Sequence, residues 1–167
     1  MASSLRALTT PALAAAMLAL GISRQCGAAE PAAGASPNAP VTPLELVKNA
    51  PRGTLKNPYT GQPDKIAQGR ELFMSYSCSG CHGGTGGGGM CPPINDDVWF
   101  YGIDDDTLFR LITLGSADML KAGFDRLGGP GLSMPPFGAL IKSDDELWKI
   151  IAWIRSIYTG DPKKKTW

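Results

Sequence analysis

The sequence has little of what several large classes of protein require. It contains one histidine, His82, so any chemistry that needs an imidazole must use that residue. Its 16 Lys and Arg residues are nearly balanced by 15 Asp and Glu residues, and it lacks the basic excess expected of a nucleic-acid-binding protein. No strand pattern of useful length and no internal repeat is visible. With 21 glycines and 14 prolines, we expect a small, loop-rich, all-α protein.

The sequence also lacks an apolar run long enough to span a membrane. The run Ala12–Ile22 has about half of the roughly 20 residues that a spanning helix needs. Arg6 precedes it and small residues follow at 27–29, so the pattern predicts a signal peptide over residues 1–29. Lipid attachment at Cys26 is the alternative, but the residues before it are not the small and apolar ones expected there. We expect an exported protein with no membrane span after cleavage.

The remaining chain divides by composition into three parts. Residues 30–63 are rich in Ala, Pro, Gly and Asn, and we expect them to form an extended N-terminal arm. Residues 64–160 carry the helical patterns and are expected to form the domain. Residues 161–167 are expected to form a basic C-terminal tail.

Three segments of the domain have apolar residues at helical spacing. The first runs over 64–76 with Asp64 as its N-cap, and the second over 105–114. The third begins at a capping box formed by Ser143 and Glu146. Residues 115–139 are expected to be mostly loop, with one helical turn near 118–122. The residues expected to face the core are Ile66, Gly69, Phe73, Tyr76, Leu108, Leu111, Ile112, Leu147, Ile150, Ile151, Ile154 and Ile157.

Residues 78–82 read Cys-Ser-Gly-Cys-His, the pattern that attaches haem in c-type proteins. Two thiols three positions apart at a helix end can each form a thioether with a vinyl group on one edge of a porphyrin. The next residue then presents its imidazole to the iron. The pattern predicts one covalently bound haem c, with Cys78 and Cys81 as thioether residues and His82 as an axial iron ligand.

Other interpretations of the cysteines are open. A thioredoxin-like pair needs a helix after the motif, whereas residues 83–89 contain six glycines. A zinc site could combine the motif with Cys91, although the adjacent Cys81 and His82 seldom bind one tetrahedral ion. The third alternative is that the motif occurs by chance and that its two cysteines form an ordinary disulfide. Cys91 itself is expected to be a small buried residue facing the haem pocket, with a ligand or redox thiol as alternatives.

A low-spin electron carrier needs a second axial ligand, and the sequence has no second histidine. Met74 and Met90 lie too close to the motif to reach the opposite face of the ring. Met134 is favoured because the two prolines after it stiffen its backbone, and Met119 is the alternative methionine. An open sixth position would instead make the protein a haem sensor or small-gas binder. An enzyme such as a peroxidase is disfavoured because no distal histidine remains to act as a base.

Two further features are expected to shape the pocket. The Pro92 carbonyl can accept a hydrogen bond from the His82 ring and fix its orientation. Trp99 is expected to pack on the haem, with its indole N–H reaching a propionate. An acidic cluster could steer a partner or could be a solvated helix N-terminus. The cluster consists of Asp96, Asp97, Asp104, Asp105 and Asp106.

The order helix, C-x-x-C-H, proline-containing loop, Met-Pro and aromatic C-terminal helix resembles the class I cytochrome c family over residues 64–160. The resemblance implies an all-α fold of three to five helices around one covalently bound haem, with long Gly/Pro-rich loops. It also implies that Gly69 and Phe73 cross Trp153 and that Met134 is the distal ligand.

Further motifs lie between residues 57 and 114. They are Asn57-Pro58-Tyr59, CSGCHG, GGGGM-x-PP, Asp96-Asp97-x-Trp99, Tyr101-Gly102 and an Asp-rich Thr-Leu-Phe. Together they are similar to the cytochrome cL type, which serves PQQ-dependent methanol and alcohol dehydrogenases. This resemblance implies a periplasmic one-electron carrier, not an enzyme. Its donor would be such a dehydrogenase, and its acceptor a downstream cytochrome c or terminal oxidase. The segment 116–133 is longer than this resemblance predicts.

Overall fold

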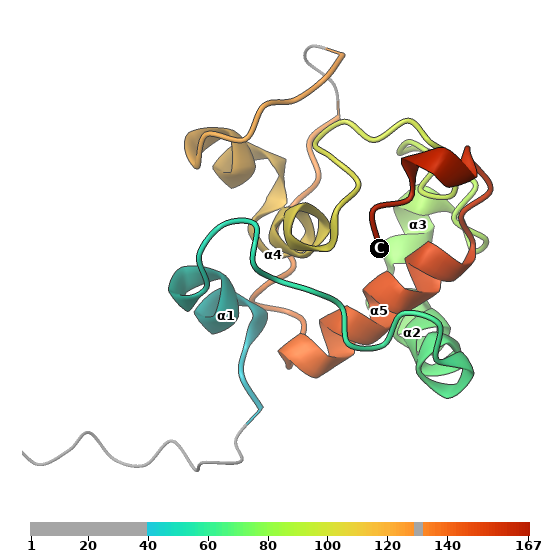
Figure 1. Cartoon of the computed structure of the whole chain (residues 1–167), viewed down its shortest axis with the longest axis horizontal. Coiled ribbons are helices and arrows are strands. Elements are labelled where there is room, and N and C mark those ends of the chain that lie inside the picture. The colour runs from blue at the N-terminus through green and yellow to red at the C-terminus, as the bar shows by residue number, and fades with distance from the viewer. Residues whose placement is uncertain (1–39, 129–131) are drawn as a thin grey trace, which may run out of the picture. The chain divides into compact units, whose positions relative to one another are not determined.

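The computed structural model describes residues 40–128 and 132–167, so the expected signal peptide and the first part of the expected arm lie outside the described residues. The described part contains five α-helices, one 3-10 turn and no β-strand, which confirms the all-α prediction (Figure 1). The elements are α1 (Pro43–Asn49), α2 (Pro63–Ser75), α3 (Cys78–His82), α4 (Asp105–Lys121), α5 (Asp144–Ser156) and η1 (Pro162–Lys164).

None of the helices within residues 40–128 and 132–167 combines the length and apolarity that a membrane crossing requires.

The centre of the fold is the crossing of α2 and α5, visible in Figure 1. Gly69 lies at the contact, where an added Cβ would be 1.9 Å from the carbonyl oxygen of Lys149. Only glycine lets the two backbones approach this closely. One turn later Phe73 packs on Trp153, with ring centroids 4.4 Å apart. The predicted crossing is therefore present. The α5 side chains Leu147, Ile150, Ile151 and Ile154 are buried as predicted, whereas Ile157 is half-buried.

The start of α5 confirms one half of the predicted capping box. The Ser143 hydroxyl accepts a hydrogen bond from the backbone N–H of Glu146 at 3.3 Å. The Glu146 carboxylate does not return to the N-cap, however, and this half of the prediction is wrong. It accepts instead from the Tyr76 hydroxyl and, at 3.3 Å, from the Lys142 N–H. Glu146 therefore connects the end of α2 to the start of α5.

The segment expected to be an extended arm contains a helix, α1, that the sequence reading missed. Thr42 and Glu45 form its capping box: the Thr42 hydroxyl accepts from Glu45 N–H at 3.3 Å, and the Glu45 carboxylate accepts from Thr42 N–H at 3.1 Å. Helix α1 packs against α4, and Leu55 further along is only 8% exposed. Residues 43–49 are therefore helical and part of the packed structure, because a local cap and tertiary contacts outweigh the Ala/Pro-rich composition.

One predicted helix boundary changes and another is confirmed. Helix α2 begins at Pro63 with Gln62 as its N-cap, so Asp64 lies in the first turn and is not the cap. Proline suits this first position because its missing N–H has no partner there. Helix α4 is broken at Gly115, where φ is 72° and ψ is 167°, so its first part ends near residue 114 as predicted and its second part, which ends at Lys121, includes the predicted turn near 118–122.

Two buried ion pairs hold α4 in place. Asp105 accepts from Arg155 of α5 at 3.1 Å, and Asp106 accepts from Arg110 at 2.8 Å. Arg110 also donates to backbone carbonyls of the preceding segment, those of Val47, Ala50 and Pro51. At 4% and 3% exposed, Asp105 and Asp106 are not part of an acidic surface, and that interpretation is wrong for them. They connect α4 to its neighbours.

Candidate functional site

The Cys-Ser-Gly-Cys-His motif forms the short helix α3, directly after α2. Cys78 and His82 line an open cavity of about 860 Å³, a volume that includes space continuous with solvent. Cys81 lines an adjoining pocket of about 490 Å³, which shares Cys78 and His82 with the larger one. The three motif residues are thus gathered at one cavity system.

Most of the cavity wall is apolar. Helices α2, α4 and α5 and the loop before α4 supply aromatic and aliphatic side chains, namely Phe73, Leu108, Leu111, Ile112, Ile150, Ile154, Val98, Trp99 and Phe100. Such a wall suits a flat, largely apolar macrocycle and keeps water away from it. The cavity and the donor groups of α3 therefore fit a haem.

The predicted hydrogen bond between His82 and Pro92 is present. The His82 Nδ1 lies 2.9 Å from the Pro92 carbonyl oxygen. A carbonyl oxygen only accepts hydrogen bonds, so Nδ1 carries the proton and Nε2 keeps its lone pair. A second partner of this kind is what fixes the ring of a metal-ligating histidine.

The glycine-rich loop after α3 folds back onto the helix. Gly88 N–H donates to the His82 carbonyl at 3.0 Å, and Cys91 N–H donates to the Cys81 carbonyl at 3.0 Å. These bonds satisfy carbonyls that the end of a short helix leaves free, and they bring Pro92 next to the His82 ring. Cys91 is half-buried rather than buried, and it lines the smaller pocket.

Of the two methionines considered as the second ligand, only Met134 belongs to the cavity wall, and it lines both pockets. Met119 is fully buried in α4 and lines neither of them. Met74 and Met90 are 43% and 70% exposed. The structure thus brings Met134 together with Cys78, Cys81 and His82.

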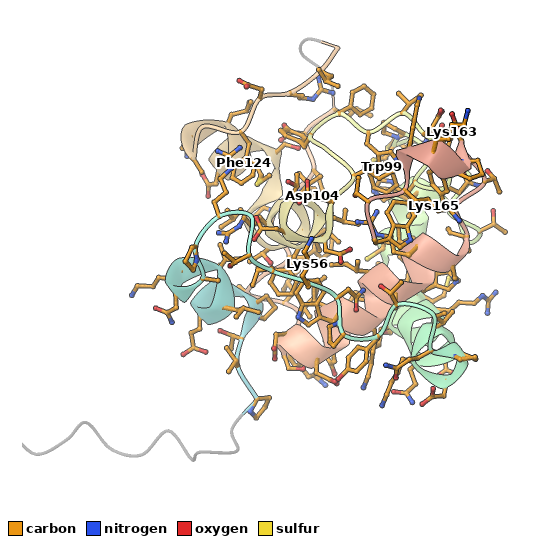
Figure 2. The ribbon with its side chains drawn as sticks, in the orientation of Figure 1. Lys56, Trp99, Asp104, Phe124, Lys163 and Lys165 are labelled. Atoms are coloured by element: carbon orange, nitrogen blue, oxygen red, sulfur yellow. The ribbon has the colours of Figure 1, made fainter. Side chains whose placement is uncertain are left out.

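Trp99, labelled in Figure 2, belongs to the loop between α3 and α4 and lines the cavity. Its indole N–H donates to the Asp96 carbonyl at 2.7 Å. Because the indole has a single proton, the prediction that it reaches a propionate is wrong.

Sequence reasoning missed Arg126, which also lines the cavity. The one feature of the sequence that could have indicated Arg126 is its position in the segment 116–133, which is longer than the resemblance predicts.

The cysteines are free in the described structure. Burial, reinforced by the neighbouring Cys81, raises the pKa of the Cys78 thiol to about 11. A redox-active C-x-x-C pair requires the opposite shift, toward a stable thiolate. Cys78 therefore does not have the electrostatic environment of a thioredoxin-like nucleophile.

Comparisons with known proteins agree with this geometry. Residues 64–154, more than half of the chain, match the family described as cytochrome c oxidase, cbb3-type, subunit III. Cytochrome c-L of Methylorubrum extorquens is 32% identical over 116 residues, which are 68% of this chain and 51% of that protein. The chain thus spans about half the length of this relative.

Two solved structures of cytochrome cL are also similar. The one from the marine methylotrophic bacterium Methylophaga aminisulfidivorans MPT has a TM-score of 0.53 at 30% identity and covers 74% of this chain and 72% of its own. The one from Hyphomicrobium denitrificans has a TM-score of 0.54 at 30% identity and covers 77% and 69%. The fold, the cavity and the match over residues 64–154 show that the chain belongs to that family and is a class I c-type cytochrome with a single covalently bound haem c. It resembles cytochrome cL.

Proposed function

We propose that the protein is a periplasmic one-electron carrier, not an enzyme, in which Cys78 and Cys81 would attach haem c and His82 and Met134 would bind its iron. The observation that carries the proposal is the shared pocket of about 490 Å³, whose wall contains all four of these side chains. When bound, haem supplies one-electron chemistry by cycling between the ferric and ferrous states.

The chain's own residues would set the properties of this site. The Pro92 carbonyl holds the proton on Nδ1 of His82 and so leaves Nε2 as the nitrogen available to the iron. A thioether ligand from Met134 favours ferrous iron and raises the reduction potential relative to two histidines. The apolar side chains of the wall exclude water and limit the reorganisation that accompanies electron transfer.

We further propose a PQQ-dependent methanol or alcohol dehydrogenase as the electron donor and a downstream cytochrome c or terminal oxidase as the acceptor. The similarity to cytochromes cL of methylotrophs supports this pairing. So do Val98 and Leu132, which line the cavity and yet are 59% and 64% exposed. An electron donor that docks over these two side chains would stand next to the cofactor, because apolar exposed patches commonly mark protein contacts.

Stopped-flow reduction of the ferric holoprotein by a PQQ methanol dehydrogenase, with methanol present, tests the proposal. We expect rapid appearance of the ferrous spectrum. Leu132→Glu should slow this reaction at least about tenfold, because it places a charge in an apolar contact. Leu140→Glu is the matched control, since Leu140 is equally exposed at 62% but does not line the cavity.

Leu140→Glu should be reduced by a small chemical donor at the wild-type rate, and Leu132→Glu should be slowed much less with this donor than with the dehydrogenase. Failure of calcium-type and lanthanide-type enzymes alike, together with normal chemical reduction, would remove the proposed donor. It would leave the electron carrier itself in place.

A further inference from the structure

Arg126 is a cation in a cavity wall that is otherwise largely apolar. Among the described residues that line the larger cavity, it is the only lysine or arginine. Its Nη1 atom is buried and has no hydrogen-bond partner among the described residues. A buried guanidinium nitrogen without an acceptor costs free energy, so an unfilled donor at a ligand cavity points to an acceptor supplied by the ligand.

We propose that Arg126 binds a propionate carboxylate of the haem. This inference rests on the proposed function, in which the cavity holds the haem. Haem brings two carboxylates into the protein, and a guanidinium donates to a carboxylate in a charge-assisted, often bidentate arrangement. The pairing would satisfy the free Nη1 donor and neutralise one negative charge at the cavity.

Packing holds the segment that carries Arg126. Leu127 N–H donates to the Phe100 carbonyl at 2.7 Å, and the Arg126 guanidinium lies 4.7 Å from the centroid of the Phe100 ring. The beginning of the same segment is held by Arg52, which donates to the Gly123 carbonyl at 3.1 Å. The Arg52 guanidinium also lies 3.5 Å from the centroid of the Phe124 ring, and Phe124 is labelled in Figure 2. Arg126 is therefore positioned by two anchors and is not a freely moving surface side chain.

The other donors considered for this role do not combine a free N–H group with a place in the cavity wall. The Trp99 indole N–H is bonded to the Asp96 carbonyl. Arg155 also has a buried Nη1 atom without a partner among the described residues, but it is paired with Asp105 and does not line the cavity. Arg126 is thus the donor that both lines the cavity and retains a free N–H group.

The test compares holoprotein variants by midpoint potential and by ferrous-minus-ferric infrared spectra in the carboxylate region. Arg126→Gln removes the charge, and Arg126→Lys keeps it. Arg52→Gln loosens the same segment without changing the cavity wall, and Arg70→Gln removes an exposed charge from α2.

We expect Arg126→Gln to lower the midpoint potential, because loss of a nearby positive charge favours ferric iron. We also expect it to shift the propionate bands. Arg126→Lys should restore much of the potential. Arg52→Gln, which loosens one anchor but keeps the guanidinium of Arg126, should shift both readouts by less than Arg126→Gln does, and Arg70→Gln should leave both at wild-type values.

Wild-type potential and propionate bands in Arg126→Gln would overturn the inference, as would an equal shift in Arg52→Gln. If the wild-type protein nevertheless carries covalent haem and shows the iron–thioether band, either result would remove only the proposed role of Arg126. A wild-type holoprotein without that band would instead contradict the ligation in the proposed function.

Discussion

Ser116 and Met134 are joined by two hydrogen bonds that run in opposite directions. Ser116 N–H donates to the Met134 carbonyl at 2.9 Å, and Met134 N–H donates to the Ser116 hydroxyl at 3.0 Å. The kink at Gly115 makes this possible, because it takes Ser116 out of the regular hydrogen-bonding of α4. An added Cβ at Gly115 would lie 2.8 Å from the Met134 carbonyl oxygen.

The kink also frees two carbonyls of α4 for the same segment. Phe137 N–H donates to the Ile112 carbonyl at 2.9 Å, and Gly138 N–H donates to the Thr113 carbonyl at 3.0 Å. The segment that carries Met134 is therefore bonded to α4 along its length. The break in this helix positions the proposed ligand.

Ser116→Ala should weaken the hold on Met134. Loss of one hydrogen bond that leaves the Met134 N–H unpaired costs about 1 kcal/mol. An external ligand such as imidazole should then displace Met134 more readily, with roughly fivefold tighter apparent binding to the ferric protein. Optical titration measures this affinity. Ser133→Ala changes an exposed neighbour and is the control; equal imidazole affinities in Ser116→Ala and wild type would refute the positioning role of Ser116.

Gly69→Ala should destabilise the holoprotein by about 3 kcal/mol, at the upper end of overpacking effects. The added methyl group would meet the backbone carbonyl of Lys149, which cannot move aside as a flexible side chain can. Urea unfolding followed by circular dichroism measures the change. Gln68→Ala, at an exposed position of α2, should stay within about 0.5 kcal/mol of wild type. A stable Gly69→Ala variant would mean that the two helices can separate at little cost.

Asp106→Asn should show a stability loss that depends on pH. Burial alone would raise the pKa of Asp106, but hydrogen bonds from Arg110 and from backbone N–H groups outweigh it and hold the pKa below its ordinary value. A lowered folded-state pKa contributes stability above the unfolded-state pKa of about 4, and this contribution is lost as pH falls through the folded value. At neutral pH we expect a loss of about 3 kcal/mol, because Arg110 is left buried without its partner.

Urea unfolding from pH 7 downward measures this dependence. The difference between wild type and Asp106→Asn should begin to shrink below about pH 4, where the carboxyl group of the unfolded wild-type chain becomes protonated, and it should be lost as pH falls through the lower pKa of the folded state. A difference that stays constant over the whole range would exclude the ion pair as its source.

Local patterns in the sequence predicted the parts of the molecule that local interactions determine. Helix α5 begins at its predicted cap, Ser143, and the Cys78–His82 motif forms one compact element. The bond from His82 to Pro92 was also predicted, since only ten residues separate them and a ligating histidine needs such a partner. Even α1 had a local signal in Thr42 and Glu45, but the composition around it argued for an arm.

The wrong predictions concern side chains that have several possible hydrogen-bond partners, because the sequence alone does not indicate which partner is used. Glu146 bonds to Tyr76, 70 positions away, rather than to its own N-cap. Trp99 uses a carbonyl three residues back and has no proton left for a ligand. Arg126 reaches the cavity because its segment is anchored to Phe100, a contact that no spacing rule predicts.

The ferric absorption spectrum tests the central claim most directly, measured for the wild-type holoprotein and for two methionine variants. Met134→Ala removes the proposed ligand, whereas Met119→Leu changes a buried methionine that lies outside the cavity wall. We predict a low-spin spectrum with an iron–thioether charge-transfer band in wild type and Met119→Leu, and loss of that band in Met134→Ala. A high-spin ferric spectrum in the wild type, or an unchanged band in Met134→Ala, would contradict the account of a His82- and Met134-ligated electron carrier.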